Sequence, residues 1–110
     1  CFMTYHIVSQ STFTHAALSS RGDGHPSISP DKKWVVLDSY PGISRHQSLY
    51  LYNLATGDVK MVGSFYSPPA YANAQRCDLH PRWSADGKIV IDTTHTGKRE
   101  ICIIDVSSVI

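Results

Sequence analysis

The sequence has few cysteines, almost no net charge and no long apolar run, and each shortage argues against a class of protein. Three cysteines among 110 residues, without a C-x-x-C spacing, do not fit a disulfide framework. The net charge of +1 does not fit a nucleic-acid binder that neutralises phosphates. No apolar run approaches the roughly 20 residues of a membrane helix. We expect neither nucleic acid nor membrane as a partner.

Localisation is only weakly constrained by the sequence. Reduced thiols and a start without a signal-peptide pattern favour the cytoplasm. The chain begins with Cys1 rather than Met, so we expect that sequence upstream of it has been removed.

What the sequence does contain is an internal repeat. The segment HPSISPDK, at 25–32, returns as HPRWSADG at 80–87. Each copy is followed by an apolar run that ends in Asp and a hydroxyl residue, at 34–39 and 88–93, and later by a second apolar run. Three pairs of identical residues lie 55 positions apart: His25 and His80, Ser29 and Ser84, Asp31 and Asp86. A period of this length is typical of four-stranded propeller blades.

The repeat predicts an all-β fold of about two and a half four-stranded antiparallel propeller blades. Residues 1–24 are interpreted as the outer hairpin of a preceding blade plus a loop, with a helix over 12–18 as the alternative to its second strand. Residues 25–76 form a blade and a connector, and residues 77–110 form a second blade of three strands. We expect strands at 2–8, 12–18, 25–29, 34–40, 48–54, 59–65, 77–84, 88–94 and 99–106.

An array this short leaves sheet edges open, because closed propellers contain about four to eight blades. We expect the edges to be covered either by missing blades, if the chain is the C-terminal part of a longer propeller, or by self-association. The first alternative is favoured. Residues 2–8 could fill the missing outer strand of the last blade, within one chain or in a neighbour.

The repeated histidines are the first candidate site. His25 and His80 each precede a proline at the start of an innermost strand, and innermost strands line the channel of a propeller. Converging imidazoles can bind a metal or a substrate. The alternative is structural, with each histidine bonded to a neighbouring loop. Both interpretations remain open from the repeat alone.

The pattern H-P-x-x-S-x-D, with its following apolar strands, resembles the TolB-type propeller repeat. More narrowly, residues 23–31 and 76–84 resemble the last blades of oligogalacturonate-lyase-like propellers. That resemblance implies a divalent metal, usually Mn²⁺, held by three histidines and a glutamine, some of them in a Q-x-x-H-x-H-P segment. Here Gln75 and His80 match the segment, Asp78 stands where the family has histidine, and His25 is the candidate ligand from the preceding blade. Asp also binds manganese.

The resemblance further implies β-elimination on an acidic oligosaccharide, after a base removes the proton next to a uronate carboxylate. The family's base and its substrate-binding arginine come from earlier blades, so the isolated chain is expected to be inactive. Arg45, Arg76 and Arg82 are candidates for binding the acidic sugar, or are simply solvated. The alternative function is a non-catalytic propeller module that binds a protein or glycan partner.

Overall fold

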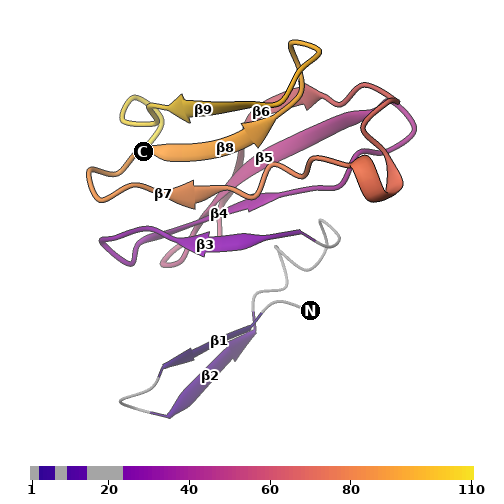
Figure 1. Cartoon of the computed structure of the whole chain (residues 1–110). Helices are drawn as coiled ribbons and strands as arrows, with labels where there is room; N and C mark the ends of the chain where they lie inside the picture. The colour runs from indigo at the N-terminus through magenta and orange to yellow at the C-terminus, as the bar shows by residue number, and fades with distance from the viewer. Residues whose placement is uncertain (1–2, 7–9, 15–23) are drawn as a thin grey trace.

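The computed structural model describes residues 3–6, 10–14 and 24–110. In these residues the regular structure consists of nine strands in three antiparallel sheets and one short 3₁₀ helix, η1 (Asn73–Gln75) (Figure 1). The expected all-β architecture is therefore confirmed. None of the helices in the described part of the chain is long and apolar enough to cross a membrane.

The N-terminal sheet is a hairpin of β1 (Met3–His6) and β2 (Ser11–Thr14) that stands apart from the other two sheets in Figure 1. The described parts of both expected strands are strands, and the remaining residues of 2–8 and 12–18 lie outside the described residues. Within the described residues, β1 belongs to a two-stranded sheet with β2 and does not pair with β9, so it does not complete the last blade of the same chain here; whether 2–8 fills that place in a neighbour stays a prediction.

The second sheet is a complete blade with the order β3-β4-β5-β6. Residues of β4 are apolar on both faces and almost all buried, as expected for a strand that has packing partners on each side. The first strand is shorter than predicted and the third begins two residues earlier. The strands are β3 (Pro26–Ile28), β4 (Trp34–Asp38), β5 (His46–Asn53) and β6 (Val59–Tyr66).

The third sheet has three strands, β7 (Arg82–Trp83), β8 (Ile89–Thr93) and β9 (Glu100–Ile104), in that order. The strand expected over 77–84 is reduced to two residues. His80 has a φ of 43°, in the left-handed region that no regular strand residue adopts. The strand can therefore begin only after it.

The two copies of the repeat also share a turn. In each, a serine hydroxyl donates to the Asp two residues later, and the chain then passes through a left-handed position. That position is Lys32 in the first copy, with φ 64°, and Gly87 in the second, with φ 84°. Glycine adopts this conformation without cost, whereas lysine does so only under strain.

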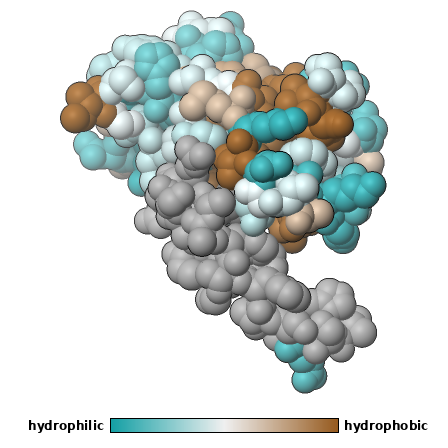
Figure 2. Space-filling model, turned by 180° about the vertical axis from the view of Figure 1, so that it is seen from behind, coloured by the Kyte–Doolittle hydropathy of each residue, from teal (hydrophilic) through white to brown (hydrophobic). Residues whose placement is uncertain are grey.

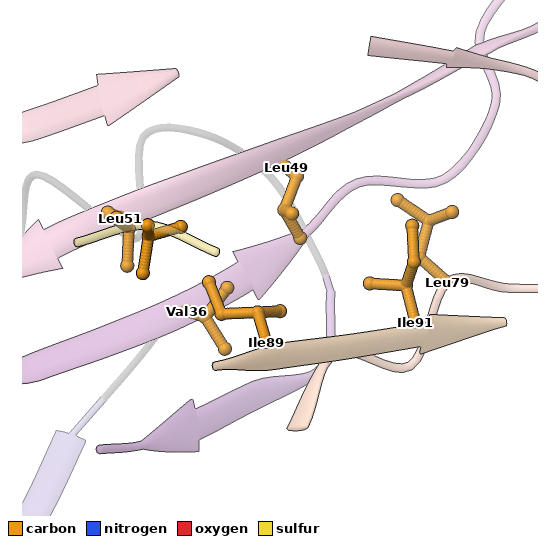
Figure 3. Packing of buried hydrophobic residues seen from close by; sticks show 7 residues of the cluster. Val36, Leu49, Leu51, Leu79, Ile89 and Ile91 are labelled. Atoms are coloured by element: carbon orange, nitrogen blue, oxygen red, sulfur yellow. The ribbon is translucent and has the colours of Figure 1, made fainter. Parts of the chain in front are cut away.

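The core lies between the four-stranded and three-stranded sheets. Side chains from both sheets point toward one another and are fully buried (Figure 3). Trp34 and Trp83 pack against this cluster, and the Trp83 indole donates to the Ser27 carbonyl at 3.0 Å. The buried cluster consists of Val36, Leu49, Leu51, Leu79, Ile89, Ile91 and Val106. The sheets are thus stacked as neighbouring blades, with β3 and β7 side by side (Figure 1).

The outer face of the third sheet carries exposed apolar side chains. Ile101 and Ile103 of β9 are 69% and 68% exposed. In the described residues β9 pairs only with β8, so its second edge is open. Exposed apolar faces of this kind are what a stacked sheet would cover. Figure 2, which views the molecule from the opposite side to Figure 1, shows that apolar residues also gather on part of that side.

Candidate functional site

Three residues that could bind a metal meet where the two stacked sheets begin. His25 precedes β3, while Asp78 and His80 lie between η1 and β7. One potential ligand atom from each lies within 4.8 Å of the others. Metal–ligand bonds of about 2.0–2.6 Å place any two ligands of one ion within roughly 4–5 Å. Two imidazoles and a carboxylate at this separation can hold one divalent cation after small side-chain adjustments.

A buried carboxylate, that of Asp38 at the end of β4, anchors both histidines. Its Oδ1 accepts the His25 backbone N–H at 2.6 Å, and its Oδ2 accepts the His80 backbone N–H at 3.2 Å. The His25 ring nitrogen Nδ1 lies 3.1 Å from Oδ2. The two imidazole rings stack with centroids 3.9 Å apart. One carboxylate thus ties together histidines that are 55 residues apart in the sequence.

The close approach of the chain to β4 depends on Gly24. A Cβ atom added there would lie 2.0 Å from the Asp38 backbone oxygen. No side chain can be accommodated without moving the backbone, so glycine is required at this position for His25 to reach Asp38.

The segment that carries Asp78 and His80 is fixed by contacts with three elements. Leu79 is fully buried in the core, and its carbonyl accepts the Asp92 backbone N–H at 2.9 Å. The buried Gln47 side chain donates to the Cys77 carbonyl at 3.3 Å. The burial of Leu79 and these hydrogen bonds fix the backbone on which Asp78 and His80 stand.

The Asp78 carboxylate is buried and only partly satisfied. Its Oδ2 lies 3.3 Å from Arg76 Nε, whereas Oδ1 is enclosed and has no hydrogen-bond partner among the described residues. An unpartnered buried carboxylate oxygen is costly by about 1–3 kcal/mol or more. A cation held between Asp78 and the histidines would give this oxygen a partner, so the residues present fit a metal.

Beside the cluster is an open pocket of 560 Å³ with positive and negative groups in its wall. Arg99 lies 5.2 Å over the Tyr71 ring and donates to the Gln75 carbonyl at 2.6 Å. Burial raises the pKa of the Cys77 thiol above its ordinary value, so this thiol is protonated at neutral pH. The lining residues are Asn73, Ala74, Arg76, Cys77, Asp78, His80, Asp92 and Arg99.

The predicted site residues fall into two groups. His25, Asp78 and His80 come together, Arg76 lines the pocket, and Arg82 pairs with Asp92 at 3.0 Å beside it. Gln75 is exposed on η1 and is not among the residues that line this pocket, and neither is Arg45.

The Arg45 guanidinium donates to three backbone carbonyls, those of Ser67, Pro68 and Tyr71. It holds the connector between the two sheets, and these bonds engage its Nε and one of its two Nη groups. Sequence reasoning missed Asp38 and Arg99. The only signal for Asp38 was its repeated position at a strand end, equivalent to Asp92.

Comparison with known proteins supports the fold. No protein-family model and no curated protein matches the chain. Among solved structures, TolB from Acinetobacter baumannii matches with a TM-score of 0.59 and 26% sequence identity, over 76% of this chain and 18% of that chain. This chain has the fold of part of a β-propeller. More narrowly, the propeller is TolB-like, and the chain spans less than a fifth of the length of the TolB that it matches.

Proposed function

We propose that the chain contributes a divalent-metal site and an anion-binding wall to a TolB-like propeller that acts on acidic oligosaccharides by β-elimination, as oligogalacturonate lyases do. The supporting observation is the juxtaposition of His25, Asp78 and His80 within 4.8 Å, with one buried Asp78 oxygen left unpartnered. The substitution of Asp for the family's histidine at position 78 keeps a ligand for manganese.

The donor set favours a first-row transition metal. Two imidazoles and one carboxylate combine nitrogen and oxygen donors, and they leave coordination positions open for water or substrate. The chemistry that a cation supplies in such a site is Lewis-acid stabilisation of negative charge on a bound carboxylate. Manganese is the metal to test first, and zinc is the natural competitor because it binds such ligands more tightly.

Arginines beside the cluster would orient the substrate. Arg76 is more than half exposed, its guanidinium lies 5.5 Å over the Tyr40 ring, and it borders the same pocket as Arg99. Guanidinium groups bind carboxylates in a two-pronged geometry. A uronate could therefore place its carboxylate between these arginines and the metal ligands. The described residues of the site offer no clear candidate for the base, which we expect from another blade.

The stacking of His25 on His80 favours a second function, a non-catalytic propeller module that binds a protein or glycan. Rings 3.9 Å apart over a shared carboxylate are also what a purely structural contact between two blades requires. In that case the histidines would hold the blades together and bind no metal.

We propose in addition that further blades cover the exposed face of β9. A propeller closes only with about four to eight blades, and the matching TolB chain is more than five times as long as the matched part. Self-association of this chain is the alternative, and the mass of the chain in solution separates the two.

Calorimetric titration with Mn²⁺ tests the metal site. The wild-type chain should bind one equivalent, and His80→Ala should lose that binding while retaining its fold. His46→Ala is a matched control, since His46 is an exposed histidine that lies on β5 and contacts Tyr66 instead. Absence of Mn²⁺ and Zn²⁺ binding in a folded wild-type chain would contradict the proposal and favour the module. If binding is found, uronate elimination is to be assayed in a protein that carries all the blades.

A further inference from the structure

We propose that Asp38 is a positioning residue that fixes the tautomer of His25, so that Nε2 of this histidine is the nitrogen presented to Asp78 and His80. The proposal concerns a residue that binds neither metal nor substrate directly. The consequence of Asp38 for metal binding rests on the function proposed above. The effect of Asp38 on the His25 tautomer is independent of that function.

The geometry determines which His25 nitrogen carries the proton. Nδ1 lies 3.2 Å and 3.1 Å from the two oxygens of the Asp38 carboxylate. A carboxylate only accepts hydrogen bonds, so Nδ1 must be the donor. In the neutral ring the lone pair is then on Nε2, which is the nitrogen left to bind a cation. Metal-binding histidines commonly have such a second partner, which also raises the basicity of the ligand.

The Asp38 carboxylate can position His25 because its own orientation is fixed. Its side chain is 1% exposed, and the two backbone N–H groups of His25 and His80 hold both of its oxygens. The chain at Gly24 passes so close to Asp38 that an added Cβ would lie 2.0 Å from the Asp38 backbone oxygen. The carboxylate is therefore a rigid reference for both histidines.

Comparison with the second repeat shows that the arrangement is not a general feature of the blade. Asp92 occupies the equivalent strand end, but its side chain is 40% exposed and pairs with Arg82 at 3.0 Å. The same residue type thus forms a surface ion pair in one blade and a buried histidine anchor in the other. Of these two aspartates, only Asp38 contacts the imidazole ring of a candidate metal ligand, His25.

The test is Asp38→Asn in the metal-free, ¹⁵N-labelled chain. Two-bond ¹H–¹⁵N correlations report which imidazole nitrogen is protonated, and His25→Gln assigns the signals. At about pH 8, where free imidazole is neutral, wild-type His25 should carry its proton on Nδ1. The amide introduced by Asp38→Asn can donate to Nδ1, so the proton should move to Nε2. Mn²⁺ affinity should fall by about 10–100-fold.

Asp58→Asn is the matched control, because it removes the same charge from an exposed turn between β5 and β6. It should change neither the tautomer nor Mn²⁺ affinity. A wild-type His25 protonated on Nε2 would overturn the proposal even if Asp38→Asn does not fold. So would an Asp38→Asn chain with the wild-type tautomer. A wild-type chain that binds no metal, but whose tautomer depends on Asp38, would overturn the proposed function and leave the positioning role intact.

Discussion

Replacement of Leu79 by alanine tests whether the core holds the site together. Leu79 is fully buried between the two stacked sheets and lies between Asp78 and His80 in the sequence. The change removes buried methyl groups and leaves a cavity, which costs about 2–5 kcal/mol of unfolding free energy. A chain of this length has a total stability of roughly 5–16 kcal/mol. Leu79→Ala should therefore remove a large part of it.

The assay is urea unfolding followed by the fluorescence of Trp34 and Trp83, which pack against the same cluster. With a slope of about 1–3 kcal/mol/M, a loss of roughly 3 kcal/mol lowers the midpoint by about 1–3 M. Ile103→Ala is the control, since Ile103 is 68% exposed. It should change stability by no more than about 0.5 kcal/mol. Equal losses in the two variants would refute the packing described here.

Three further predictions concern turns and the connector. The backbone is left-handed at both Lys32 and Gly87. Lys32→Gly should therefore stabilise the chain by about 1 kcal/mol, and Gly87→Ala should destabilise it by a similar amount. Urea midpoints that move in the opposite directions would contradict this. Arg45→Ala should increase proteolytic cleavage in 67–76, since three backbone carbonyls lose their donor, and an unchanged cleavage rate would argue against a bracing role. The hydrogen bond from the Ser84 hydroxyl holds the pKa of the Asp86 carboxyl below its ordinary value. The stability that the ionised Asp86 contributes is therefore present above the ordinary pKa and is lost as the pH falls through the lowered pKa. Ser84→Ala should raise the pKa of Asp86, as measured by carboxyl NMR titration, and an unchanged pKa would contradict this.

The repeat in the sequence was enough to predict the sheets. Apolar runs of fixed spacing identify strands, and the glycine- and proline-containing turns between them identify antiparallel neighbours. The same spacing predicted that His25 and His80 start equivalent strands. Because the innermost strands of neighbouring blades converge on the channel, identical residues at the start of those strands are brought close together.

Details of the site could not be predicted because they depend on contacts between residues far apart in sequence. The left-handed backbone at His80 shortens β7, and no local motif indicates it. Arg45 was expected near a substrate, yet its guanidinium satisfies carbonyls more than 20 residues away. Asp38 and Asp92 have equivalent positions and opposite exposure, since one strand end is covered by the next blade and the other is not.

Crystals of the chain soaked in Mn²⁺, with anomalous diffraction recorded around the manganese absorption edge, test the central claim most directly. The account predicts one anomalous peak at bonding distance, about 2.0–2.6 Å, from Asp78, His80 and Nε2 of His25. A map without such a peak, in crystals where the two imidazole rings remain stacked over Asp38, would contradict it.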